Sequence, residues 1–105
     1  MKSYKVEQFY NKNQFVIFGG GQTIFQSYDS TCAIIKDYKL TLGKDWDYSN
    51  TTMKHLYLFL NDYMYCFNSE LREKLQEALS YRNKNKRASI QKLIDQKIIK
   101  YDEDL

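Results

Sequence analysis

Residues 14–27 read QFVIFGGGQTIFQS, two short segments of β-branched and aromatic residues on either side of three glycines. Such segments favour strands, and the glycines can form a hairpin turn because glycine accepts a positive φ without steric cost. We therefore predict one strand at Gln14–Phe18 and a returning strand at Thr23–Ser27. A glycine run can also cradle a phosphate, but this one lacks the Gly-Lys-Ser/Thr ending of a P-loop and is not followed by a helix start.

Strand-like residues continue on both sides of this hairpin. Thr31–Lys36 and Lys39–Leu42 are predicted as a third and a fourth strand, joined by a tight connection. Met1–Tyr10 could add an edge strand, and Ile98–Tyr101 could pair as a last strand. The core of the prediction is a small antiparallel sheet of about four strands.

The pattern becomes helical after a polar and aromatic linker at residues 43–49. A helix is predicted at about Thr51–Tyr65, and because it is apolar nearly all round, we expect it to be central. Ser69 is expected to cap a second helix at Glu70–Arg82, and a third is expected at about Ala88–Gln96. The predicted fold class is α+β: about four antiparallel strands packed on a central helix, followed by two shorter helices, in a single domain over residues 1–105.

Composition excludes several classes of protein. The chain has 105 residues, a net charge of +3, 43% hydrophobic and 16% aromatic residues, which is enough apolar material for a folded core. The longest apolar run, Leu56–Leu60, has five residues, whereas a membrane span needs about 20. With no signal-type leader recognised, we expect a cytoplasmic protein.

The sequence offers little catalytic or metal-binding equipment. Cys32 and Cys66 lie in stretches that are expected to be buried, which suits reduced thiols that pack as small hydrophobes. His55 is the only histidine, and no paired spacing supports a metal site. A cysteine and His55 could still meet in space as nucleophile and base, or His55 could simply be a hydrogen-bonded helix residue. We predict that the protein is not an enzyme and needs no cofactor and no metal.

Hydrogen-bonding side chains and two aromatics are concentrated in Trp46–His55, around the expected start of the first helix. A helix start with adjacent Lys54 and His55 could hold a phosphate or a partner carboxylate. In the structural alternative, Ser49, Thr51 or Thr52 caps the helix and Trp46 closes the core. Both interpretations can hold together.

The C-terminal part carries the clearest charge asymmetry. Residues 82–100 contain seven basic residues and one acidic residue, Asp95. Such a patch can bind nucleic acid phosphates or an acidic protein surface, and Tyr81 and Tyr101 offer faces for stacking. A solvated face explains the same charges. The predicted binding residues are Arg82, Lys84, Lys86, Arg87, Tyr81, Lys54 and His55.

Three segments resemble a small uncharacterised domain of bacteriophage and plasmid proteins. They are Phe25–Ile35 (FQSYDSTCAII), Asp45–His55 (DWDYSNTTMKH) and Phe59-Leu60, and the resemblance covers about residues 14 to 60. It implies that a shared set of residues either joins the sheet to the helix start by hydrogen bonds or lines a common binding surface. That set is Ser27, Tyr28, Ser49, Thr51, Thr52, Lys54 and His55.

From the small size and the resemblance, we expect a non-enzymatic binding protein of phage or mobile-element origin. The specific hypothesis is an inhibitor of a host nucleic acid-targeting defence, of the anti-CRISPR type, that acts by steric occlusion. The alternative is a nucleic acid-binding accessory or regulatory protein that uses the C-terminal basic patch. The expected partner is a host protein or ribonucleoprotein, or nucleic acid directly, with no membrane involved; an exposed sheet edge also leaves open a homodimer.

Overall fold

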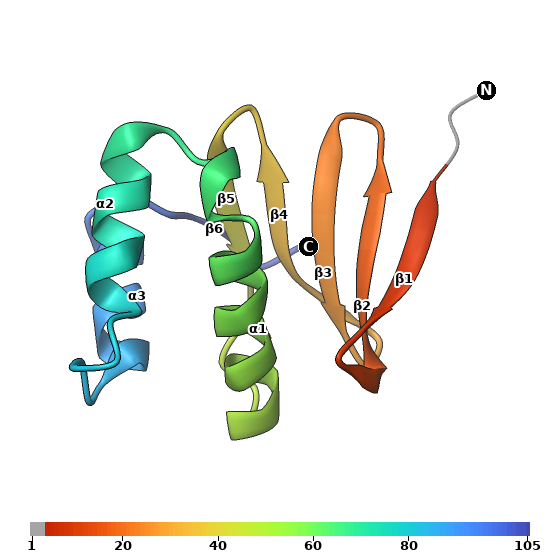
Figure 1. Cartoon of the computed structure of the whole chain (residues 1–105), viewed down its shortest axis with the longest axis horizontal. Coiled ribbons are helices and arrows are strands. Elements are labelled where there is room, and N and C mark those ends of the chain that lie inside the picture. The colour runs from red at the N-terminus through yellow and green to blue at the C-terminus, as the bar shows by residue number, and fades with distance from the viewer. Residues whose placement is uncertain (1–3) are drawn as a thin grey trace.

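Six strands form one sheet in the order β1-β2-β3-β4-β5-β6 (Figure 1). In the computed structural model, which describes residues 4–105, the first five strands form an antiparallel meander and β6 pairs in parallel with β5. The strands are β1 (Lys5–Phe9), β2 (Asn11–Gly19), β3 (Gln22–Ser27), β4 (Ser30–Lys36), β5 (Lys39–Gly43) and β6 (Lys100–Asp102).

Our prediction of about four strands packed on a central helix is therefore wrong. The class is α+β, but the sheet has six strands, because both edge segments pair. Four of the five residues of β1 are exposed, and β6 has only three residues, so neither edge strand shows the alternation that marks a half-buried strand. Residues 1–3 of the segment considered as an edge strand lie outside the described residues.

The hairpin turns explain the meander. Gly20 and Gly21 have φ angles of 62° and 76°, and they link the paired residues Gly19 and Gln22 in the two-residue loop that the glycine run predicts. Asp37 and Tyr38 connect β4 to β5 with φ angles of 52° and 65°. These are left-handed values that favour glycine, so this turn carries strain that the flanking strands must hold.

The helices are α1 (Asn50–Asp62), a short 3₁₀ turn η1 (Met64–Cys66), α2 (Ser69–Ala78) and α3 (Lys86–Asp95). Ser49 caps α1 by accepting a hydrogen bond from the backbone N–H of Thr52. The expected cap of α2 at Ser69 is wrong, because the side chain of Asn68 accepts from Leu71 N–H instead. The α2 helix also ends earlier than predicted, where Asn83 Nδ2 donates to the carbonyl of Ala78 at 2.7 Å.

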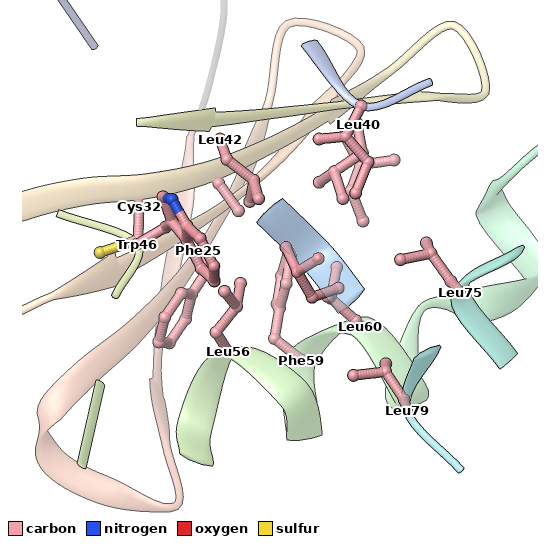
Figure 2. Packing of buried hydrophobic residues seen from close by; sticks show 14 of the residues in the cluster. Phe25, Cys32, Leu40, Leu42, Trp46, Leu56, Phe59, Leu60, Leu75 and Leu79 are labelled. Atoms are coloured by element: carbon pink, nitrogen blue, oxygen red, sulfur yellow. The ribbon is translucent and has the colours of Figure 1, made fainter. Parts of the chain in front are cut away.

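A continuous apolar core lies between the sheet and the helices (Figure 2). At its centre the Phe59 ring of α1 stacks on Phe25 of β3 with ring centroids 5.4 Å apart. Leu40 and Leu42 of β5 and Leu75 of α2 extend the core toward the other helices. None of the helices in residues 4–105 has the length and apolar composition that a membrane crossing requires.

Gln14 of β2 breaks the apolar character of this core. Its side chain is 0% exposed, and among residues 4–105 neither its Oε1 nor its Nε2 has a hydrogen-bond partner. Burying an amide without partners is unfavourable by about 1–3 kcal/mol. The strand neighbour opposite Gln14, Ser27, has its hydroxyl bonded to Thr52 and therefore does not relieve the amide.

We expect Gln14→Met to raise the free energy of unfolding by about 1–3 kcal/mol, because methionine keeps the length of the side chain and removes the unpaired amide. Urea unfolding at neutral pH measures the change. Gln8→Met, on the exposed part of β1, is the control and should shift stability by no more than about 0.5 kcal/mol. A loss of stability in Gln14→Met would show that the amide is satisfied.

Candidate functional site

The basic joint, defined here as Arg82–Arg87, lies between α2 and the first turn of α3. Its shape follows from short-range polar contacts: Asn85 caps α3 by accepting from Ala88 N–H, and Asn85 N–H donates to the side chain of Asn83. These bonds order residues 82–85, which are neither helix nor strand, while Lys86 and Arg87 already belong to the first turn of α3. The charged side chains of the joint are thus presented from an ordered segment.

The structure brings Lys54, on the second turn of α1, to the same surface as Lys84, Lys86 and Arg87 of the joint. The four side chains line one cavity of about 510 Å³, which we name the α1–joint cavity. The other lining residues are Asn50, Met53, Tyr57, Leu58, Asn61 and Asn85. No carboxylate belongs to this lining as the structure describes it, so the cavity carries a positive potential and favours an anion.

The cations that line the α1–joint cavity differ in whether they form hydrogen bonds or ion pairs with other groups of the protein. Lys86 donates from Nζ to the carbonyl of Asn83 at 3.0 Å, which fixes its position without neutralising its charge. Lys54 and Lys84 are exposed and form no ion pair within residues 4–105. All three charges therefore remain available to a ligand.

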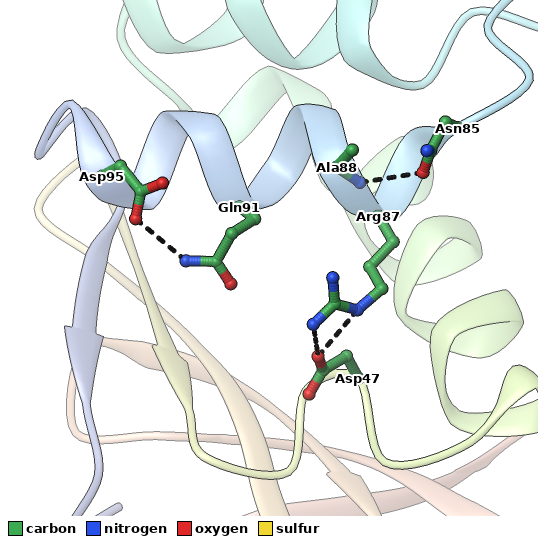
Figure 3. A network of polar contacts seen from close by, with 6 residues as sticks. All are labelled: Asp47, Asn85, Arg87, Ala88, Gln91 and Asp95. Carbon is green, nitrogen blue, oxygen red and sulfur yellow. Dashed lines mark hydrogen bonds and ion pairs between the residues drawn. The ribbon is translucent and has the colours of Figure 1, made fainter.

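Arg87 is different because it is paired. Its Nη2 and Nε lie 2.7 Å and 2.9 Å from one carboxylate oxygen of Asp47, and its guanidinium lies 5.9 Å from the centre of the Trp46 ring (Figure 3). Trp46 is 2% exposed and belongs to the core. Arg87 thus fastens the start of α3 to the loop before α1, and Asp47 offsets part of its charge.

A second cavity, of about 810 Å³, lies between α2 and α3. We name it the helix-pair cavity. It is lined by three cations, Lys74, Arg82 and Lys92, and by one carboxylate, Glu77. Lys74 is not among the predicted binding residues because it precedes the basic stretch by eight positions. It joins Arg82 and Lys92 in the lining of this cavity because α3 packs beside α2.

Tyr81 directly precedes the basic joint, and its neighbours Ser80 and Arg82 line the helix-pair cavity. Its side chain is 80% exposed, the highest value among the large hydrophobic residues of the described chain. The Arg82 guanidinium lies 5.7 Å from the centre of the Tyr81 ring, and Arg82 Nε donates to the Tyr81 hydroxyl at 3.3 Å. Tyr101, the other candidate for stacking, lies in β6 at the sheet edge and not at this surface.

His55 does not share the surface of its neighbour Lys54. It is 7% exposed, and its Nδ1 lies 2.8 Å from the backbone carbonyl of Thr51. The ring is therefore held within α1, as expected for a hydrogen-bonded helix residue. Within the described residues, no group of three or more histidine, cysteine or acidic side chains is placed to hold a metal ion.

The other residues named by the resemblance join the sheet to the start of α1. The hydroxyls of Ser27 and Thr52 lie 3.0 Å apart in the buried interface, and Ser49 Oγ donates to Thr52 Oγ1 at 3.2 Å. With Tyr28 and Thr51, they border a third cavity of about 620 Å³. The expected hydrogen bonds between sheet and helix start are thus present for Ser27, Ser49 and Thr52, and Lys54 is the member of the set that reaches the α1–joint cavity.

Cys32 is buried and is one of the residues that line this third cavity, and Cys66 is partly exposed; neither forms a disulfide. Burial raises the pKa of the Cys32 thiol to about 11, because a thiolate there would lose its hydration. At pH 8 only about one Cys32 in a thousand is then a thiolate, and the thiolate is the reactive form.

We therefore expect iodoacetamide to modify Cys66 well before Cys32 in the native protein at pH 8. The rate at Cys32 should rise about tenfold per pH unit toward pH 11, since each unit multiplies its thiolate fraction by ten. Peptide mass spectrometry measures both rates, and the protein unfolded in urea is the control, in which both thiols react. Equal rates in the native protein at pH 8 would contradict the shifted pKa.

Comparison with known proteins places the chain in a family but assigns no activity. A protein-family model described as a family of unknown function (DUF8033) matches residues 2–77. Neither the curated proteins nor the solved structures gave a match. The matched residues contain α1 and the cluster around Ser27 and Thr52, whereas the basic joint follows them. Because the match covers well over half of the sequence, the chain belongs to the DUF8033 family of unknown function.

Proposed function

We propose that this chain is a non-enzymatic binding protein that holds nucleic acid directly, with the basic joint and Lys54 as its contact surface. The observation that carries the proposal is the α1–joint cavity, where Lys54 meets Lys84, Lys86 and Arg87 and no carboxylate is among the described lining residues. A cationic concave surface raises the local concentration of a polyanion and binds its phosphates by releasing counterions.

The positions of the candidate catalytic groups support binding over catalysis. The Cys32 thiol is buried and has a raised pKa, which disfavours the nucleophilic thiolate. The His55 ring is engaged by the backbone of its own helix. A cysteine nucleophile with a histidine base would need both groups accessible to a substrate.

A second candidate function is the steric inhibitor of a host nucleic acid-targeting defence, of phage or mobile-element origin and acting in the host cytoplasm. Tyr81 and Arg82 favour a protein partner, because exposed tyrosine and arginine side chains dominate the binding energy of many protein interfaces. In this case the basic joint would contact an acidic surface that normally receives nucleic acid.

The two candidates differ in their dependence on salt and on nucleic acid. Direct binding should weaken steeply with ionic strength, with a log–log slope of roughly −0.9 per duplex phosphate contacted and −0.7 per single-strand phosphate. A titration of the protein against labelled oligonucleotides at several salt concentrations measures this slope. If no oligonucleotide binds even at low salt, direct recognition of nucleic acid is wrong. A partner that is retained from bacterial lysate after nuclease treatment would then favour the inhibitor.

A further inference from the structure

We infer that the nucleic acid held by this surface is single-stranded, with one base stacked on Tyr81 and its backbone lying in the cavities on both sides of the basic joint. This inference rests on the proposed function and specifies its ligand. Three features of the structure point to it: an exposed aromatic ring among cations, two concave cationic cavities, and an α3 helix whose exposed face carries a carboxylate and an arginine already paired with Asp47.

Tyr81 is the first feature. Proteins that bind single strands combine a cationic path for the backbone with aromatic rings on which bases stack. The Tyr81 ring is almost fully exposed, and the hydrogen bond from Arg82 to its hydroxyl restrains it. A restrained and solvent-facing ring next to a guanidinium offers a base a stacking partner with little ordering cost. In a duplex, both faces of each internal base are already covered by its neighbours.

The two cavities are the second feature. Arg82 lines the helix-pair cavity, while Lys84, Lys86 and Arg87 line the α1–joint cavity. The joint therefore borders both cavities, with different residues facing each. The cavities together are lined by seven cations, of which Arg87 is paired with Asp47, and by a single carboxylate, Glu77. A flexible strand can bend into both hollows as it crosses the joint, whereas the phosphates of a stiff duplex would meet mainly the rims.

The third feature is the environment of α3, the helix that follows the joint. Its Ile90 and Leu93 are buried in the core, and Ser89 accepts a hydrogen bond from Asn83 on the α2 side. The side that remains exposed carries Arg87, Ala88, Lys92 and Asp95. Arg87 is paired there with Asp47, and Figure 3 shows Gln91 on that same side of the helix, directed toward Asp95. A helix that reads a duplex groove contacts bases and phosphates through its exposed face, whereas on this face of α3 Arg87 is already paired with Asp47 and Asp95 repels phosphates.

The experiment measures fluorescence anisotropy with three probes: oligo(dT), oligo(rU) and a DNA hairpin duplex, each of about 20 nucleotides per strand so that one binding site is covered. We expect the single strands to bind at least about tenfold more tightly than the duplex at the same salt concentration. We also expect Tyr81→Ala to weaken strand binding by about tenfold to a hundredfold and to leave duplex binding nearly unchanged. Comparing the affinities for oligo(dT) and oligo(rU) shows whether the surface prefers single-stranded DNA or RNA.

Two further variants test whether a loss of single-strand binding in Tyr81→Ala is caused by the loss of base stacking. Tyr81→Phe keeps the aromatic face and should retain strand binding, although it loses the hydroxyl bonded to Arg82. Tyr65→Ala removes a ring that is 72% exposed from the 3₁₀ turn after the C-terminal end of α1, away from the lining of both cavities, and should have no effect. Circular dichroism spectra of all variants establish that each is folded.

The possible outcomes separate the inference from the proposed function. Equal affinity for strand and duplex, or an unchanged affinity in Tyr81→Ala, overturns the single-strand inference and leaves the cationic binding surface in place. Failure of all three probes to bind at low salt overturns the proposed function and this inference with it. Loss of binding in Tyr81→Phe to the same degree as in Tyr81→Ala overturns the stacking role.

Discussion

Phe59→Ala is expected to lower the free energy of unfolding by about 3–5 kcal/mol, the range observed when a fully buried aromatic ring is removed. The Phe59 ring is fully buried on α1, and it contacts rings from three parts of the chain. It stacks on Phe25, meets the edge of Phe9 at 6.1 Å and lies 5.1 Å from Tyr63. Because β1, β3 and the residue that follows α1 all pack on this side chain, the cavity left by alanine cannot close by moving one element alone.

Chemical denaturation followed by circular dichroism measures this effect. Since domains of this size are stable by only about 5–15 kcal/mol, this loss is a large fraction of the total free energy of unfolding. Phe59→Leu keeps most of the volume and should retain the fold, with a smaller loss than alanine. Tyr65→Ala, on an exposed ring, is the control and should change stability by no more than about 0.5 kcal/mol. A loss below about 1 kcal/mol in Phe59→Ala would mean that this ring is not central to the core.

The central hairpin could be predicted from the sequence because its signals are local. The glycines at 19–21 and the β-branched residues on either side act within a few positions, and the structure has strands β2 and β3 where those signals place them. The helix starts were harder to locate. At the start of α2, Asn68 and Ser69 are both good capping residues, and only the backbone geometry decides in favour of Asn68.

The edge strands could not be fixed from the sequence, since their pairing depends on distant partners. β6 has three residues and pairs with β5, about sixty positions earlier in the chain. An isolated segment of that length shows no periodicity. Its position follows from the packing of α2 and α3, which return the chain to the open edge of the sheet (Figure 1).

The candidate site could be predicted only in part, because some of its residues are close in sequence and others are brought together by packing. Arg82, Lys84, Lys86 and Arg87 are close in sequence, so their clustering is local and visible in the sequence. The addition of Lys54 and Lys74 depends on helix packing that no spacing in the sequence encodes. The ion pair between Arg87 and Asp47 spans 40 positions, and it changes the role of Arg87 from a free cation to a residue that also anchors α3.

The largest effect on binding is expected from replacing Lys54, Arg82, Lys84 and Lys86 together by alanine. Arg87 is kept, because its removal would leave Asp47 without its partner and would confuse binding with stability. Four lost phosphate contacts should reduce the steepness of the salt dependence by roughly 2.8 to 3.6 log–log units, at −0.7 to −0.9 per phosphate. At a salt concentration of about 0.15 M this corresponds to a loss of affinity of roughly two hundredfold to a thousandfold.

A matched variant distinguishes an effect of the basic joint on affinity from an effect of the total net charge. Replacing Lys12, Lys36, Lys39 and Lys100 by alanine removes the same number of exposed cations, all of them on or between the strands of the sheet. If binding depends on the basic joint, this control should keep most of the affinity and of the salt slope of the unmodified protein. If both quadruple variants lose affinity equally, only the overall charge matters, because long-range attraction depends on total charge whereas counterion release requires contact. If the quadruple variant of Lys54, Arg82, Lys84 and Lys86 binds as tightly as the unmodified protein, the α1–joint cavity is not part of the binding surface.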